Sequence, residues 1–403
     1  MNSATLKNAK GAPATSALPH WPHFEQDELR AVEAVLRSGK INYWTGTEGR
    51  EFEKEYAAYT RSAFGIALAN GTVTLELALA VLGIGEGDEI VTTPRTFIAS
   101  ASCAVMRGAT PVFADIDRDS QNITAATIER VLTPRTKAII PVHLAGWPCE
   151  MDEIVELARA RRIAIIEDCA QANGARYKDR PVGGIGDFGS FSFCQDKIMT
   201  TGGEGGMLVT NDEAMWSRAW SYKDHGKSFD AVYKREHGPG FRWLHESFGT
   251  NWRMTEMQAA IGRIQLGKLD GWILRRRAHA ARLRDLLKKT PGLRVPVPPE
   301  HVYHSYYKFY AFIEPDCLRS GWTRDRIVAE IVAMGVPCFS GSCSEVYLEK
   351  AFEGHSSRPV ERLPVARELG ETSLMFLVHP TLESVHIDRA AEAARDVLGR
   401  ALI

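Results

Sequence analysis

The sequence predicts an α/β protein whose larger part is a doubly wound, mostly parallel sheet, followed by a smaller α+β C-terminal domain. From residue 63 onward, short apolar segments alternate with stretches of helical periodicity, as in repeated strand–helix–strand units. Residues 163–170, IAIIEDCA, are apolar almost throughout, which is typical of a strand buried on both faces. The proline-rich stretch 293–301 then interrupts the pattern and indicates a junction between two domains.

The elements follow in order along the chain. Apolar residues at helical spacing predict helices at residues 27–36, 48–59 and 255–287. The strands of the large domain are expected at FGIALA, EIVTT, PVFADID, KAIIPVHLAG and IAIIEDCA. The small domain is expected to contain strands near 306–313 and 373–378 and helices near 324–334 and 388–402. The resulting divisions are a loose tail at 1–20, a large domain at 21–285 and a small domain at 286–403.

Charge and composition argue against several classes of protein. Lys plus Arg number 49 against 50 Asp plus Glu, so the net charge gives no reason to expect nucleic acid or an anionic membrane as a partner. No stretch reaches the roughly 18 consecutive apolar residues of a membrane helix, and the first 20 residues lack a signal-peptide core. Seven cysteines without paired zinc spacing predict free thiols, no metal site and a cytoplasmic location.

An isolated lysine, Lys197, stands between a strand and a glycine-rich turn in residues 189–212, GSFSFCQDKIMTTGGEGGMLVTND. A lysine amine whose pKa is lowered by burial can attack an aldehyde and can later move a proton as a general base. On spacing alone, an ordinary surface lysine is the commoner explanation.

A carboxylate, Asp168, ends the buried strand about 30 residues earlier. A carboxylate in that position needs a cationic partner, and a protonated pyridine nitrogen is one that would also let the ring accept electrons. An aspartate that caps the next helix is the alternative. Gln171, one helical turn later, could reach a phenolic oxygen on the same ring.

Three further segments suit a phosphorylated, flat cofactor. Asn70, Gly71 and Thr72 lie where the first strand passes into a helix, so backbone N–H groups and the helix dipole can bind a phosphate there. Ser192 could add a hydroxyl, and Phe97 could stack on a ring. The structural alternatives are a capped strand-to-helix turn and an ordinary core phenylalanine.

Taken in order, these motifs resemble the DegT/DnrJ/EryC1/StrS family of sugar aminotransferases. The resemblance runs from about residue 21 to the C terminus and is carried by NGTVTLEL, GDEIVTTPRTFIAS, PVHLAG, IIEDCAQANGA, GSFSFCQDKIMTTGGEGG and NWRMTEMQAAIGRIQL. It implies the fold-type-I architecture of aspartate aminotransferase and pyridoxal 5'-phosphate as cofactor, with pyridoxamine 5'-phosphate as its intermediate form. It also implies a homodimer whose active sites lie at the subunit interface.

The resemblance assigns roles to individual residues. It makes Lys197 the Schiff-base lysine, Asp168 the partner of the pyridine nitrogen, Gln171 the contact to the ring oxygen and Phe97 the stacking residue. The phosphate-binding positions are Gly71, Thr72, Ser192 and, from the other subunit, Asn251. Polar residues near segments that resemble the family's substrate-binding regions are His143, Arg253, His304, Tyr306 and Glu345, for which ordinary polar positions are the alternative.

The implied reaction is ping-pong transfer of an amino group from L-glutamate to a nucleotide-linked keto sugar, such as a 4-keto-6-deoxyhexose, for a surface polysaccharide or a natural product. Related sugar 3-dehydratases carry histidine in place of the lysine, so Lys197 argues against that alternative. A cofactor- or sugar-binding sensor without turnover is the other alternative, and no basic stripe supports it. Cys194 stands where many family members have histidine, which leaves the details of the substrate open.

Overall fold

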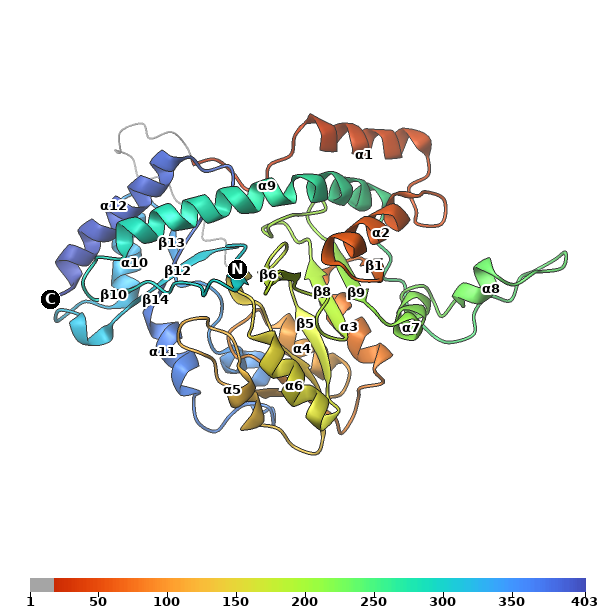
Figure 1. Cartoon of the computed structure of the whole chain (residues 1–403), viewed down its shortest axis with the longest axis horizontal. Helices are drawn as coiled ribbons and strands as arrows, with labels where there is room; N and C mark the ends of the chain where they lie inside the picture. Colours follow the sequence, from red (N-terminus) through yellow and green to blue (C-terminus); the bar gives the residue numbers. More distant parts are fainter. Residues whose placement is uncertain (1–17) are drawn as a thin grey trace.

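A seven-stranded sheet forms the centre of the large domain (Figure 1). The computed structural model describes residues 18–403. The strand order is β1 (Phe64–Leu68), β9 (Gly206–Thr210), β8 (Phe188–Ser192), β5 (Ala164–Asp168), β4 (Thr136–Ile140), β2 (Glu89–Thr92) and β3 (Thr110–Phe113). Strand β9 is antiparallel to both of its neighbours, and every other pair is parallel. The predicted mostly parallel sheet is therefore confirmed.

Apolar side chains cover both faces of this sheet. Ile166, Phe188 and Leu208 pack with the helices on one face, whereas Ile139 and Ile165 belong to the core on the other. Two-sided burial explains why these strands read as continuous apolar runs. The helices of the domain are α1 (Gln26–Ser38), α2 (Glu48–Thr60), α3 (Gly71–Val81), α4 (Ala99–Met106), α5 (Ala125–Glu129), α6 (Met151–Arg161), α7 (Glu213–Lys223) and α8 (Phe229–Tyr233).

The strand register decides where a site can form. Strands β5 and β8 run parallel, with Asp168 opposite Ser190. Their carboxyl ends therefore meet at one edge of the sheet, where ligands of open α/β sheets bind. The polar residues that follow β1, β4, β5 and β8 are brought to the same edge.

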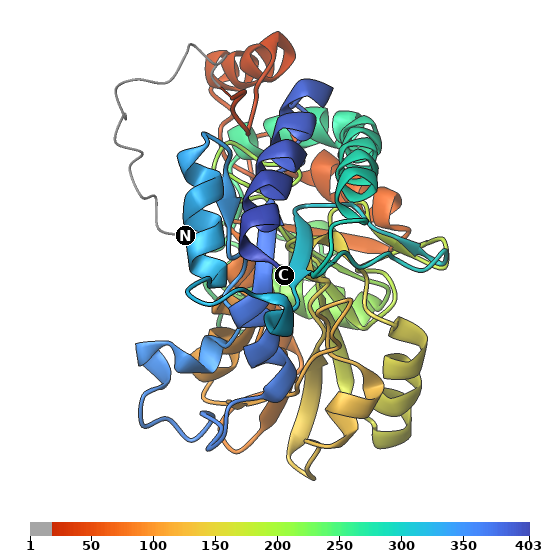
Figure 2. The ribbon, with the colours of Figure 1, turned by 90° about the vertical axis from the view of Figure 1, so that its left-hand side faces the viewer.

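The small domain is built on an antiparallel four-stranded sheet. Its strand order is β10 (Leu293–Arg294), β12 (Phe309–Ile313), β14 (Ser373–Phe376) and β13 (Cys338–Phe339). Its helices are α10 (Arg324–Ala333), α11 (Pro364–Thr372) and α12 (Ser384–Ala401). Figure 2 shows α12 between α10 and the long helix α9 (Glu256–Leu287). The strands and helices expected in this domain are present, as is the predicted α+β composition.

Helix α9 connects the two domains. Its first turn is fixed by a capping box between Thr255 and Gln258, in which each residue's side chain bonds the other's backbone N–H. Ala259 and Leu269 pack in the core of the large domain, whereas Leu283 and Leu287 pack in the core of the small domain. The predicted boundary after residue 285 thus falls within the last turn of this helix.

Some features were not expected from the sequence. A three-stranded sheet, β11 (Val302–Tyr303), β6 (Arg176–Tyr177) and β7 (Arg180–Pro181), joins residues that lie more than 100 positions apart. Of the predicted loose tail, residues 1–17 lie outside the described residues, whereas Leu18 and His20 contact the small domain. Leu18 contacts the core of the small domain, and Thr381 Oγ1 donates to His20 O at 3.0 Å. None of the helices in residues 18–403 is long and apolar enough to cross a membrane.

Candidate active site

Asp168 ends strand β5 and is 4% exposed. Its Oδ2 accepts a hydrogen bond from Ser100 Oγ at 2.7 Å, and its Oδ1 accepts one from Ala170 N at 3.0 Å. The Ser100 hydroxyl in turn lies 2.8 Å from Thr96 Oγ1. Within residues 18–403, no cationic side chain pairs with this carboxylate. A buried carboxylate that lacks a cation fits a ligand with a protonated nitrogen, as the pyridine ring of the predicted cofactor supplies.

The predicted phosphate site lies where β1 passes into α3. Asn70 caps the helix, and its Oδ1 accepts the N–H groups of Thr72 and Val73, both at 3.1 Å. A Cβ added at Gly71 would lie 2.5 Å from Ser192 Cβ, so only glycine allows the end of β8 to come this close. The structure therefore brings together Gly71, Thr72 and Ser192, whose two hydroxyls lie at a helix N terminus, a site suited to a phosphate.

Lys197 follows β8 and is half-buried. Its backbone is fixed on both sides, since its N–H donates to Cys194 O at 3.1 Å and its carbonyl accepts from Trp21 Nε1 at 2.8 Å. Its Nζ lies 5.1 Å from the centre of the Tyr307 ring. The neighbouring carboxylate, Asp196, accepts a hydrogen bond from the Tyr307 hydroxyl instead of pairing with the amine. Within the described chain, the amine therefore has no ionic partner.

Phe97 and Gln171, two further predicted cofactor contacts, each have a group that can still contact a ligand. Phe97, just before α4, is 61% exposed, so one face of its ring can stack on a ligand. Gln171 Oε1 accepts a hydrogen bond from Ala145 N at 3.0 Å, while its NH₂ group makes none with the described residues. Cys194, at the position of the frequent histidine, is partly buried, and burial raises the pKa of its thiol.

His143 is fully buried, and both of its ring nitrogens are used. Cys149 N donates to its Nδ1 at 3.0 Å, and its Nε2 lies 3.1 Å from Glu167 Oε2. The His143 ring therefore has no nitrogen left for a substrate. With Cys169, these two residues form a group with metal-ligand chemistry, but burial raises the pKa of the Cys169 thiol well above its usual value. The Glu167 carboxylate is already occupied by backbone N–H groups of Gly183, Ile185 and Gly186.

Arg253 and Asn251 lie at the base of a projecting segment, residues 225–250. Arg253 forms an ion pair with Asp224, which is fully buried, and Asn251 forms an isolated β-bridge with the same residue. The side chain of Asn251 is exposed. Arg253 also forms an isolated β-bridge with Leu68, the last residue of β1 before the phosphate site.

Tyr307, in the segment before β12, lies beside Lys197 and was not among the predicted site residues. His304 and Tyr306 stack on each other with ring centres 3.8 Å apart, and burial holds the pKa of His304 well below its usual value. Tyr306 has a left-handed backbone, with φ of 49°. This turn directs the next residue, Tyr307, toward Lys197. Glu345 is engaged elsewhere, since it accepts a hydrogen bond from Arg362 Nε at 2.9 Å.

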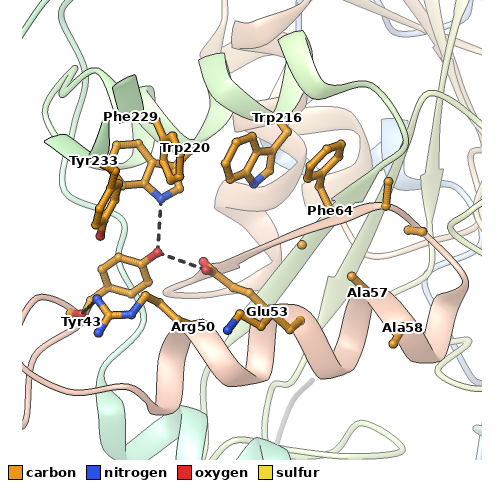
Figure 3. Close-up of a pocket in the computed structure, with 14 residues that line it drawn as sticks. Tyr43, Arg50, Glu53, Ala57, Ala58, Phe64, Trp216, Trp220, Phe229 and Tyr233 are labelled. Atoms are coloured by element: carbon orange, nitrogen blue, oxygen red, sulfur yellow. Dashed lines mark hydrogen bonds between the residues drawn. The ribbon is translucent and has the colours of Figure 1, made fainter. Parts of the chain in front are cut away.

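A pocket of about 500 Å³ lies at the β1 edge of the sheet (Figure 3). Its walls come from α2, β1, α7 and α8, and none of the predicted site residues lines it. At its base, Tyr43 donates a hydrogen bond to Glu53 at 3.1 Å and accepts one from Trp220 at 3.2 Å. Fully buried Lys223 completes the group, with its Nζ 2.5 Å from Glu53 Oε1. The polar groups here are bound to one another.

The comparisons with known proteins agree with this geometry. The model of the DegT/DnrJ/EryC1/StrS aminotransferase family matches residues 22–395. GDP-perosamine synthase from Escherichia coli O157:H7 is 40% identical, over 88% of this chain and 92% of its own length. Spore coat polysaccharide biosynthesis protein SpsC from Bacillus subtilis (strain 168) is 33% identical, over 94% and 96% of the two chains.

Solved structures of aminotransferases also match this chain. The aminotransferase from Psychrobacter cryohalolentis is 56% identical, covers 95% of this chain with 99% of its own, and superposes with a TM-score of 0.94. The predicted fold-type-I architecture and the predicted transaminase class are confirmed. The family also implies dependence on pyridoxal phosphate, which the free amine of Lys197 and the unpaired carboxylate of Asp168 fit. The chain belongs to the DegT/DnrJ/EryC1/StrS aminotransferase family.

Proposed function

We propose that this protein transfers an amino group from L-glutamate to a nucleotide-linked keto sugar, with pyridoxal phosphate bound covalently to Lys197. The observation that carries the proposal is the combination of a free amine at Lys197 with a buried, cation-free carboxylate at Asp168. The E. coli relative supports the substrate class, because its name specifies a GDP-linked sugar product. A 4-keto-6-deoxyhexose is the keto sugar that we propose.

The site residues have separate roles in the proposed reaction. When bound, the cofactor serves as electron sink and carrier of the amino group. Asp168, held by Ser100, keeps the ring nitrogen protonated, while Gly71, Thr72 and Ser192 hold the phosphate. The Lys197 amine, which has no ionic partner within residues 18–403, would serve as the general base and acid for proton transfer. In this ping-pong scheme, the keto acid leaves before the keto sugar binds.

The proposed enzyme is a homodimer. Phe241, Trp243 and Phe248 on the projecting segment are 77%, 80% and 98% exposed, and Figure 1 shows α8 and the segment after it pointing away from the large domain. Large exposed apolar side chains on one segment indicate a protein partner. A second copy that covers this segment would bring its Asn251 to the phosphate site. Sedimentation of the wild type and of a Phe241→Ser/Trp243→Ser variant tests whether the protein is a dimer and whether these side chains hold the two copies together.

The function is tested by absorption spectroscopy of the purified protein with pyridoxal phosphate. Glutamate should convert the lysine-bound cofactor to the pyridoxamine form, and one of the GDP-, UDP- or dTDP-linked 4-keto-6-deoxyhexoses should restore the first spectrum. Binding of a keto sugar without any amino product would instead favour the sensor alternative. The seven free thiols are consistent with the reducing cytoplasm that we propose as the location.

A further inference from the structure

Tyr307 has two lysine amines beside it. Lys197 Nζ lies 5.1 Å and Lys308 Nζ lies 4.6 Å from the centre of its ring. Because both distances are measured to the same ring centre, the two nitrogens are no farther apart than their sum. Lys308 is half-buried and, like Lys197, makes no ion pair or side-chain hydrogen bond within residues 18–403. A second unpaired ammonium therefore lies over the same tyrosine ring as the Lys197 amine.

The surroundings contain more positive than negative charge. Arg276 is 1% exposed and donates from Nη1 to the carbonyls of Tyr306 and Tyr307, at 3.4 and 3.3 Å. Its Nε and Nη2 have no hydrogen-bond partner in the described part of the chain, and its guanidinium lies over the Trp21 ring, 5.0 Å from the ring centre. The carboxylate that faces this group is Asp196, and it is already bound by the Tyr307 hydroxyl. Lys308 and Arg276 thus both face a single carboxylate that the Tyr307 hydroxyl already binds.

The excess charge persists at neutral pH. Burial is the main cause that lowers the pKa of Lys308 to about 8; Asp196 opposes this shift, while Arg276 and Lys197 contribute to it. An amine with that pKa is still mostly protonated at pH 7. Nearby His379 adds no charge, because burial together with Arg276 and Lys308 lowers its pKa to about 3. Buried charge of one sign is costly unless a counter-ion enters.

We propose that Lys308, with Arg276 behind it, forms an anion subsite beside Lys197 that binds a carboxylate of the amino donor. The inference rests on the proposed function and specifies its donor half. An amino acid carries a carboxylate on the carbon that bears its amine, so an anion site next to the reactive lysine is where that group must go. The flexible ammonium of a lysine is suited to a carboxylate whose position changes as the amine reacts.

The test uses the cofactor-loaded protein and glutarate, a dicarboxylate that has no amine and cannot react. Calorimetry should give a dissociation constant about 10- to 100-fold higher for Lys308→Met than for the wild type, as expected when a charge-assisted hydrogen bond is lost. Lys308→Arg, which keeps the charge, should stay within about threefold. Lys289→Met is the matched control, because Lys289 is exposed and makes no ion pair, and it should bind glutarate like the wild type.

Kinetics of the two half-reactions then identify the source of the anion. The expected result is a raised KM for glutamate in Lys308→Met with kcat/KM for the keto sugar unchanged. Unaltered glutarate binding in Lys308→Met would overturn the subsite, and so would weakened binding of GDP with glutarate binding intact, since the anion would then be the sugar's diphosphate. If the wild type binds glutarate through Lys308 but transfers no amino group, the proposed function fails while the subsite stands.

Discussion

Two regions of the molecule contain the same three kinds of side chain and use them differently. Beneath the pocket at the β1 edge, Lys223 Nζ lies 4.3 Å from the centre of the Tyr43 ring, and the Tyr43 hydroxyl donates to Glu53. At the end of β8, Lys197 lies over Tyr307, and the Tyr307 hydroxyl donates to a carboxylate as well. Each region therefore combines a lysine, a tyrosine and an acid.

The difference lies in whether the amine meets the acid. Lys223 pairs directly with Glu53 and is fully buried, so its charge is neutralised within the chain. Lys197 and Lys308 share a tyrosine whose acid, Asp196, is bound by the hydroxyl, and neither amine is paired within the described residues. The paired group stabilises the fold, whereas the unpaired group is available to a ligand. The two amines should therefore respond differently to substitution.

Replacing the reactive amine should have the largest effect. We expect Lys197→Ala to lower kcat by at least about 10²- to 10⁴-fold, because the group that moves the proton is lost. Its free energy of unfolding should change by less than about 0.5 kcal/mol, since no ion pair is broken. Steady-state assays and urea denaturation measure the two quantities. Turnover at the wild-type rate would refute the role of Lys197.

Replacing the paired amine should act on stability instead. Lys223→Met leaves the Glu53 carboxylate buried without its cation, so we expect the free energy of unfolding to fall by about 3–5 kcal/mol. Urea denaturation measures the loss. Adding Glu53→Gln removes the uncompensated charge while keeping an acceptor for Ala67 N, and should recover part of the stability. If Lys223→Met left the free energy of unfolding unchanged, the ion pair of Lys223 would not distinguish its role from that of Lys197.

The function of the Asp168 carboxylate should depend on the hydrogen bond that the uncharged Ser100 hydroxyl donates to it. Ser100→Ala removes the hydroxyl that orients Asp168, and we expect kcat to fall about tenfold, consistent with a charged hydrogen bond of about 1.5 kcal/mol. Ser100→Thr keeps a hydroxyl and should restore most of the rate. The affinity for pyridoxal phosphate, measured by fluorescence titration, should weaken in the alanine variant alone. Equal losses in both variants would indicate a packing role.

The smallest effect concerns the cost of the unpaired charge. Folding lowers the pKa of Lys308 from 10.5 to about 8, so the protonated amine destabilises the folded state at pH 7. Between pH 8 and 10.5 the unfolded chain binds more protons, so wild-type stability from this group rises with pH. Lys308→Met should therefore raise the Tm by about 1–3 °C at pH 7, and the gain should shrink above pH 8. A gain that is constant with pH would contradict this account.

Local patterns were sufficient for the strands of the large domain, whereas the roles of the cofactor residues come from the family resemblance and stay predictions. The apolar run before Asp168 fixed both the strand and the sheet edge at which its carboxylate lies, since parallel strands end together. The glycine at position 71 follows from the close approach of Ser192. The strand is therefore contained in a few consecutive residues, whereas the need for glycine at position 71 depends on a residue far away in the sequence.

Residues that depend on long-range contacts could not be found in this way. A single left-handed residue, Tyr306, shifts the orientation of the next side chain, so Tyr307 and not Tyr306 meets Lys197. His143 follows an apolar strand just as Asp168 does, but it turns inward to Glu167. The Lys223–Glu53 pair joins residues 170 positions apart, and no sequence pattern indicates it.

The contact between Trp21 and the Lys197 carbonyl has an optical consequence. In the proposed function Lys197 carries a coloured cofactor, and an indole that lies against this lysine would transfer its excitation to that cofactor, because resonance transfer falls steeply with distance. Of the nine tryptophans, Trp21 is hydrogen-bonded to that lysine. The proposed function therefore makes the Trp21 emission an intrinsic reporter of the cofactor's colour. In a Trp21→Phe protein, the part of the fluorescence that changes when the amino group is transferred should be reduced.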